Sequence, residues 1–156
     1  MLANSPRYIS NPRMDGYIDN TEATLSLAKC CIWYLCQSHH DSWITDDEIV
    51  DNIISGGYRL HNYAVTMWLE LVKRYVSMNG SKPLSTELIS ALECLATTRS
   101  SSDFGGSTEL SSQSHQPDLE KFKYQWPELH TMLCHVAQFR RQCSSSEYHM
   151  SKGEMS

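Results

Sequence analysis

The chain has 156 residues, of which 40% are hydrophobic, and it carries a formal net charge of −5. This length suits one small domain, and the lack of a basic block argues against nucleic-acid binding, because several Lys or Arg side chains are needed to neutralise a phosphate backbone. The longest strongly apolar stretch, residues 25–35, is interrupted by Lys29 and is shorter than the roughly 20 residues that span a bilayer, so we expect no membrane association.

An irregular arm is predicted over residues 1–18, because Pro6, Pro12 and Gly16 would interrupt a helix or a strand. This stretch lacks the apolar core of a secretory signal. Most of the cysteines fall inside apolar helical patterns, where a free thiol packs as a small hydrophobic group. We therefore expect a reduced, intracellular protein located in the cytoplasm.

A first helix is predicted over residues 20–37. Asp19 and Glu22 have the spacing of a capping box, which satisfies backbone N–H groups at a helix start. Apolar residues then recur at intervals of three and four and give the helix one apolar face: Ala23, Leu27, Cys31, Tyr34 and Leu35. The pattern ends before His39 and His40.

A short second helix is predicted next. Thr45 and Glu48 repeat the capping-box spacing, and Gly56 with Gly57 can end a helix in the left-handed conformation. The narrow apolar face of this helix consists of Ile49, Ile53 and Ile54. An acidic cluster opens it, formed by Asp46, Asp47, Glu48 and Asp51. The cluster lacks the spacing of a calcium-binding loop, so we interpret it as a solvated face that interacts favourably with the helix dipole.

The clearest helical pattern in the chain comes after this glycine pair. It places one apolar stripe over about four turns, made of Leu60, Ala64, Met67, Trp68, Leu71, Val72 and Tyr75. Asn79 and Gly80 should end this third helix. Pro83 and Ser85 then introduce a fourth helix that should stop near Thr98. Its apolar face comprises Leu84, Leu88, Ala91, Leu92 and Leu95.

Residues 99–117 are rich in serine and glycine and predict a disordered linker, because they offer too little apolar surface to offset the entropy of ordering. Residues 118–142 predict a C-terminal helical segment, whose main helix starts at Pro127 and carries Leu129, Met132, Leu133, Val136 and Phe139. Residues 143–156 predict a disordered tail. With residues 19–98 as the core domain, the sequence predicts an all-α fold, either a small irregular helical bundle or a helical-hairpin array.

Cys36, His39 and His40 form half of a zinc-binding pattern. The second half is missing, because Cys134 and His135 are adjacent to each other and about a hundred residues away. Adjacent residues on a helix point to different faces, so Cys134 and His135 also fail as a nucleophile and its base. The sequence therefore predicts no catalytic residue, no metal ligand and no cofactor.

Three tryptophans, Trp33, Trp43 and Trp68, could line a ligand pocket or form the core. Aromatic residues at helical spacing more often make core contacts, so we favour the core. Trp68 is expected at its centre, between the first and third helices. The predicted structural core consists of Leu27, Cys31, Tyr34, Leu35, Leu60, Tyr63, Ala64, Trp68 and Leu71.

The stretch over residues 17–75 reads YIDNTEATLSLAKCCIWYLCQSHHDSW, then a short acidic helix, then IISGGYRLHNYAVTMWLELV. It resembles the helical connector segment that follows the winged helix in fungal NACHT-type (STAND) signalling NTPases and related fungal multidomain proteins. The residues that carry the resemblance are Glu22, Ala23, Leu25, Leu27, Ala28, Cys31, Tyr34, Leu35, Tyr58, Leu60, Tyr63, Ala64, Trp68 and Leu69. Thr24 stands where the family often has histidine, and the Walker motifs are missing, so the resemblance implies a scaffold role without nucleotide hydrolysis.

From these patterns we expect a non-enzymatic helical scaffold or protein-interaction module. The expected contact surface is the apolar stripe of the helix over residues 60–76, which one short neighbouring hairpin would leave partly uncovered, so that other proteins or domains can bind there. The alternative is a small regulatory accessory protein that acts through its serine-rich linker and tail, where phosphorylation would add charge. The sequence specifies no oligomeric state.

Overall fold

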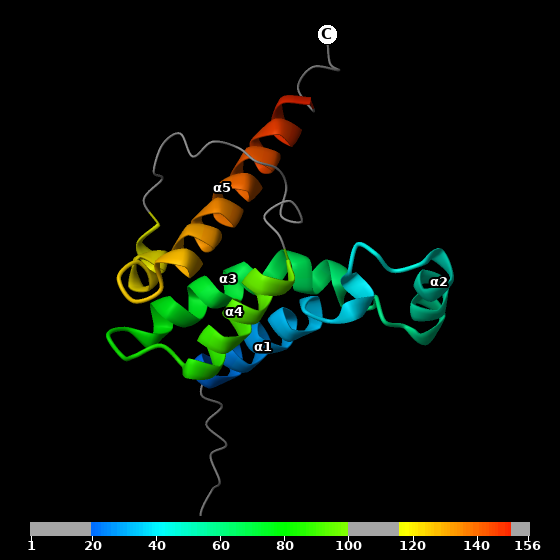
Figure 1. The fold of residues 1–156 in the computed structure, drawn as a ribbon. Coiled ribbons are helices and arrows are strands. Elements are labelled where there is room, and N and C mark those ends of the chain that lie inside the picture. Colours follow the sequence, from blue (N-terminus) through cyan, green and yellow to red (C-terminus); the bar gives the residue numbers. More distant parts are fainter. Residues whose placement is uncertain (1–19, 100–115, 151–156) are drawn as a thin grey trace, which may run out of the picture.

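The computed structural model describes residues 20–99 and 116–150 of the chain, the stretch 142–150 as backbone only (Figure 1). Across these residues the chain forms helices and no strand, which confirms the all-α class. The α-helices are α1 (Asn20–Leu35), α2 (Asp46–Ser55), α3 (His61–Asn79), α4 (Thr86–Thr98) and α5 (Pro127–Met150). Two 3-10 helices accompany them, η1 (Ser38–His40) and η3 (Pro117–Phe122).

Helices α1, α3 and α4 form the body of the molecule, in which α1 packs against both α3 and α4. Helix α2 projects from one end of this body (Figure 1). Helix α5 extends away from the body on the side of α3 and α4 that is opposite to α1. Element η3 packs against both α3 and α5, so it joins α5 to the body. The predicted C-terminal segment therefore packs on the predicted core domain.

The core is one continuous hydrophobic cluster. Its fully buried large side chains come from α1, α3, α4, η3 and α5, and they include Ile32, Trp68, Leu69, Leu88, Leu92, Leu119, Phe122 and Leu133. Burial of apolar surface at about 25 cal/mol per Å² makes this cluster the main source of stability. Because η3 and α5 contribute to it, the predicted C-terminal segment belongs to the same folding unit as α1, α3 and α4.

Five of the predicted core residues are buried, namely Cys31, Leu35, Ala64, Trp68 and Leu71, and Tyr34 is partly buried against the cluster. The prediction is wrong for Leu27, Leu60 and Tyr63, whose exposed fractions are 43%, 58% and 43%. Helix α1 turns the side that carries Ala28 and Ile32 inward, and Leu27 lies at the edge of that side, where it stays partly exposed. Leu60 precedes α3, and Tyr63 lies off its buried stripe.

Several helix boundaries follow the local signals. Thr45 caps α2 with a complete capping box, in which the Thr45 side chain accepts a bond from the Glu48 N–H and the Glu48 carboxylate accepts one from the Thr45 N–H. Gly56 ends α2 at a φ of 82°, a left-handed conformation that glycine adopts without strain. Gly80 closes α3 at a φ of 58°. The proposed cap at Asp19 lies outside the described residues.

Some boundaries differ from the prediction, and the first of them is the end of α1, which lies at Leu35 and not at residue 37. Helix α5 continues to Met150, past the expected end near Gln142, so the backbone up to Met150 does not belong to a disordered tail. No glycine or proline interrupts residues 143–150, and extending an existing helix costs little. Arg99, placed in the linker by prediction, caps α4 through its backbone N–H. Pro117, also placed in the linker by prediction, begins η3 after the N-cap Gln116. Residues 100–115 of the predicted linker lie outside the described residues, as do residues 1–19 and 151–156.

The capping box leads to a first prediction. Thr45→Ala should destabilise α2 locally by about 1 kcal/mol, the usual loss for an N-cap side chain. Because α2 contributes no buried side chain, the melting temperature of the whole chain should stay unchanged. Amide hydrogen exchange of residues 46–50 should accelerate, while exchange in α3 stays at the wild-type rate. Equal exchange in the variant and the wild type would contradict the role of the cap.

Candidate functional site: the exposed helix α2 and the corner that holds it

Helix α2 is amphipathic, yet none of its side chains is buried against the described part of the chain. Val50, Ile53 and Ile54 are spaced so that they share one side of the helix, and Ile54 is 77% exposed. We call these three residues the α2 face. Trp43, which is also 77% exposed, precedes the helix, and the exposed Leu60 follows it. Exposed apolar residues thus gather at one end of the molecule.

The net charge of the chain is concentrated in the same place. Residues 37–58 contain five acidic side chains and neither Lys nor Arg, whereas the remaining residues carry equal numbers of acidic and basic side chains. Asp46 and Asp47 stand one turn before Val50, next to the α2 face. An open cleft of about 370 Å³ separates η1 from α2 and is lined in part by His39, Trp43 and Asp51. The projecting end of the molecule is therefore both apolar and acidic.

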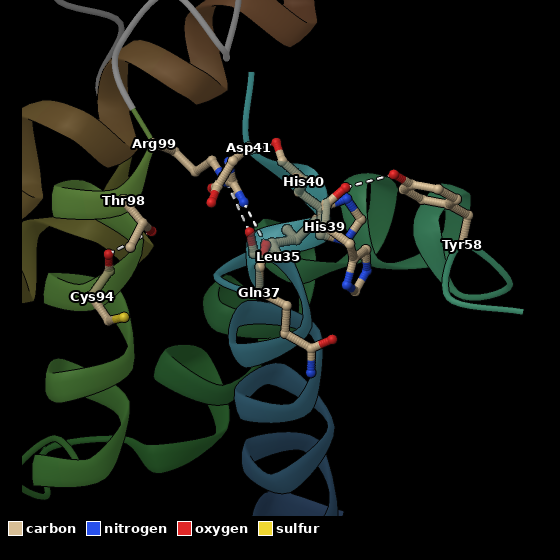
Figure 2. A network of polar contacts seen from close by, with 9 residues as sticks. All are labelled: Leu35, Gln37, His39, His40, Asp41, Tyr58, Cys94, Thr98 and Arg99. Atoms are coloured by element: carbon tan, nitrogen blue, oxygen red, sulfur yellow. Dashed lines mark hydrogen bonds and ion pairs between the residues drawn. The ribbon is translucent and has the colours of Figure 1, made fainter. Parts of the chain in front are cut away.

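Arg99 holds the chain between α1 and α2 (Figure 2). Its guanidinium group donates hydrogen bonds to the backbone carbonyls of Leu35, Gln37 and His40, at 2.8, 3.0 and 2.7 Å. It also pairs with Asp41 at 3.1 Å. The last carbonyls of a helix have no partner within the helix, so a cation at this position satisfies them and complements the helix dipole. The C-cap residue of α4 thus fixes the path of the chain that leads into α2.

Two tyrosines anchor the segments on either side of α2. The Tyr34 hydroxyl donates to the Gly57 carbonyl at 2.7 Å, and the Tyr58 hydroxyl donates to the His39 carbonyl at 2.6 Å. The first bond attaches the segment after α2 to α1, and the second attaches it to η1. We call the two segments that flank α2, residues 37–45 and 56–60, its stems. Both stems are anchored, although the helix between them is exposed.

Three histidines meet at the anchored stems. The ring centroids of His39 and His40 are 4.0 Å apart, and those of His40 and His61 are 5.1 Å apart. Tyr34 and Tyr58 pack edge-on against the ring of His40. In each histidine of this cluster one buried ring nitrogen, Nε2 of His39 and His40 and Nδ1 of His61, has no hydrogen-bond partner among the described residues. We call His39, His40 and His61 the histidine cluster.

Burial lowers the pKa of His40 from 6.5 to about 4, and the neighbouring His39, His61 and Arg99 act in the same direction. A proton on His40 would place a positive charge in a partly buried site that already holds a guanidinium group. His40 is therefore neutral at pH 7.

Cys36, His39 and His40, which form half of a zinc-binding pattern, gain no further ligands among the described residues. No group of three or more His, Cys, Asp or Glu side chains in residues 20–99 and 116–141 is placed to hold a metal ion. Cys36 is partly buried, and burial raises the pKa of its thiol to about 11, so the thiol stays protonated. His39 and His40 turn toward Tyr34, Tyr58 and His61 instead, because the stems bring these rings together.

The histidine that contacts Cys134 is not the adjacent His135. The Cys134 sulfur contacts His130, one turn earlier on α5, with 3.5 Å between Sγ and Nε2. Burial raises the pKa of the Cys134 thiol, which disfavours the thiolate that nucleophilic catalysis needs. The described residues thus offer no activated nucleophile at this position.

The three tryptophans lie in different parts of the structure. Trp68 is fully buried, whereas Trp33 and Trp43 are exposed, so the predicted core position is wrong for the latter two. Trp33 lines an open cleft of about 690 Å³ between α1 and α4, next to the ion pair of Lys29 with Glu87. Trp43 lies in a stem of α2, which leaves the body of the molecule.

The predicted contact surface is also corrected. Apart from Leu60, the apolar stripe over residues 60–76 is covered, because α3 packs against α1 and η3 and Ala64, Trp68, Leu71, Val72 and Tyr75 are all buried. On α2, by contrast, Val50, Ile53 and Ile54 are all exposed. The sequence pattern missed Arg99, whose only local signal is its position just after a helix. It also missed the contact of His61 with His40, which no local pattern encodes.

None of the helices in the described residues is long and apolar enough to span a membrane. The motif that resembles the fungal NACHT-type connector lies on α1, on α3 and in the stem before α3, where Ala28, Cys31 and Trp68 are buried and Leu60 and Tyr63 are exposed. No protein-family model, no curated protein and no solved structure matches this chain.

Proposed function

We propose that this chain is a non-enzymatic helical protein-interaction module that inserts α2 into a groove on a partner protein. One observation carries the proposal: α2 is amphipathic and capped at both ends, and yet it buries no side chain against the described residues. An isolated helix of this length is marginal in water, so the caps and the anchored stems serve to keep it folded. Because α2 stays folded while its apolar side faces outward, it is suited to docking on a partner protein.

The α2 face has the spacing of a helix that binds in a groove, because Val50, Ile53 and Ile54 follow the i, i+3 and i+4 pattern of such anchors. Transfer of each side chain from water into an apolar groove is worth about 1.5 to 3 kcal/mol. Trp43 can add a large aromatic contact beside the face. Together these residues can support a specific, reversible complex.

The charge of α2 selects the partner. Asp46, Asp47 and Asp51 would lie at the rim of the groove, so the rim should carry Lys or Arg side chains. A second copy of this chain is a poor occupant, because its own α2 carries the same acidic side chains and the two would repel each other. The proposed partner is therefore a different protein that has an apolar groove with a basic rim.

The resemblance to the connector of fungal NACHT-type signalling proteins suggests a context for such docking. A connector packs against neighbouring domains and passes conformational changes between them, and an exposed helix on anchored stems fits that task. The alternative, a regulatory accessory protein that acts through its serine-rich linker and tail, would not depend on the α2 face. The two proposals therefore predict opposite outcomes for the same substitution.

The test compares Ile53→Ser/Ile54→Ser with the wild type in affinity capture from cells that express the intact chain, followed by binding measurements with the captured protein. Loss of two anchors should weaken binding at least about tenfold. The matched control is Tyr124→Ser, which removes another highly exposed hydrophobic side chain, remote from α2 in the sequence, and should bind like the wild type. Undiminished binding by the double variant would reject α2 as the docking element and favour the linker and tail.

A further inference from the structure

The histidine cluster occupies the point where the two stems of α2 meet. His39 and His40 belong to the stem before α2, while His61 starts α3 directly after the second stem. Their rings touch one another, and each has a buried nitrogen without a hydrogen-bond partner among the described residues. Buried polar atoms normally have partners, so three unpartnered ring nitrogens in one cluster need an explanation.

We propose that the histidine cluster is a proton-controlled latch, which keeps the stems of α2 closed when its imidazoles are neutral and opens them when the imidazoles become protonated. The biological consequence rests on the proposed function, because opening the stems would remove the presented form of α2 and weaken docking. The latch itself concerns only this chain and can be tested without a partner.

The charged and titratable groups around the cluster come from every neighbouring element. Tyr34 faces it from α1 and Tyr58 from the second stem, and both hydroxyls already donate to backbone carbonyls. Arg99 reaches the cluster from α4 and opposes a further positive charge. Asp41 favours protonation of His40, but its carboxylate already accepts a bond from Arg99.

Helix α2 adds two acidic groups, since Glu48 and Asp51 line the same open cleft as His39. The Glu48 carboxylate is occupied by the backbone N–H and the hydroxyl of Thr45, which lower its pKa. A proton on His40 in the closed cluster is therefore opposed by Arg99 and two other imidazoles, and it is favoured by Asp41, whose carboxylate is already paired with Arg99. Opening the stems would expose the imidazoles to water and relieve this repulsion.

The direction of the pH effect follows from this geometry. In the closed form the pKa of His40 is about 4, while in an open, hydrated form it returns toward 6.5. Above pH 6.5 His40 is mostly neutral in both the closed and the open form, and the latch stays closed. Between pH 6.5 and pH 4 the open form binds a proton that the closed form does not, so a fall in pH shifts the equilibrium toward the open form.

The test measures amide hydrogen exchange of the intact chain at pH 7.5 and pH 5.0, expressed as protection factors so that the intrinsic effect of pH on exchange cancels. Protection in the stems and α2, residues 37–60, should fall about tenfold at pH 5.0, as expected when one partly shielded histidine has different proton affinities in two states. Protection around Trp68 in α3 should not change. Equal protection of residues 37–60 at both pH values would overturn the latch.

Variants separate the cluster from other histidines. His40→Phe keeps an aromatic ring in the stack but cannot titrate, so its loss of protection at pH 5.0 should be several times smaller than in the wild type. His135→Gln on α5, outside the cluster, should keep the full wild-type loss. A full loss in His40→Phe would overturn the proposal.

A further measurement on the wild type guards against poor folding of His40→Phe. NMR titration of the imidazole protons should show at least one histidine of the cluster with a midpoint well below 6.5. Midpoints at or above 6.5 for all three would also overturn the latch. If the latch fails while the Ile53→Ser/Ile54→Ser variant loses its partner, docking through α2 stands without pH control.

Discussion

Trp68→Ala should lower the free energy of unfolding by about 3 to 5 kcal/mol, the usual cost of emptying a large aromatic site in a core. Trp68 is fully buried in α3, and the guanidinium carbon of Arg140 lies 5.6 Å from the centroid of its ring. Arg140 also donates hydrogen bonds to the carbonyls of Val65 and Thr66 on the same helix. Removing the indole would therefore leave a cavity and remove part of the support for α5.

Urea denaturation followed by circular dichroism measures this loss. The matched control is Trp43→Ala, because Trp43 is exposed in a stem of α2 and its loss should change the stability by less than about 0.5 kcal/mol. The two variants remove the same side chain, so their difference isolates burial. A melting temperature for Trp68→Ala within about two degrees of the wild type would refute the core position, since a loss of 1 kcal/mol already shifts the melting temperature by several degrees.

Arg99→Ala should lower the free energy of unfolding by about 3 kcal/mol, the usual loss when one partner of a buried ion pair is removed and the second largest effect that we expect. The exposed fractions of the Arg99 and Asp41 side chains are 9% and 14%, so removal of the guanidinium group would leave Asp41 without its partner in a poorly hydrated site. Three backbone carbonyls would lose a charged donor at the same time. Hydrogen exchange should accelerate first at residues 35–45, because these form the end of α1 and the first stem.

Arg99→Lys and Arg74→Ala are the matched controls. Lysine keeps the charge beside Asp41 but cannot donate to several carbonyls in a fork, so its loss of stability should lie between those of Arg99→Ala and the wild type. Arg74 is an exposed arginine on α3, and its replacement should be nearly neutral. Equal stabilities for Arg99→Ala and Arg74→Ala would show that the hydrogen bonds of Arg99 do not stabilise the segment between α1 and α2.

Most helix positions were predictable because their signals are local. A capping box joins residues three apart, as in Thr45 and Glu48, and a glycine such as Gly56 ends a helix by its own conformational freedom. The apolar stripe of α3 was also predictable, since Ala64, Trp68 and Leu71 recur with the helical period. These features depend on neighbours within one or two turns, so they can be derived before any tertiary contact is known.

The candidate site depends on contacts between distant residues, and local patterns did not reveal it. Arg99 binds the carbonyl of Leu35 across 64 positions of sequence, and His61 reaches His40 only because α3 folds back along α1. Nothing near Arg99 distinguishes it from a linker arginine. The cysteine and histidine pattern around Cys36 was read only as half of a zinc motif, and it did not indicate that His40 contacts His61.

The amino-acid sequence by itself determined that this protein is helical, where α2, α3 and α4 begin and end, and that its negative charge gathers around α2. Only the tertiary structure decided which side of each helix is buried. Leu27 and Ile32 are equally apolar in a helical pattern, but α1 can turn only one side toward α3 and α4, and that side carries Ile32. Likewise α2 remains exposed because its stems are held at the corner, away from the body of the molecule, so packing leaves its apolar face free.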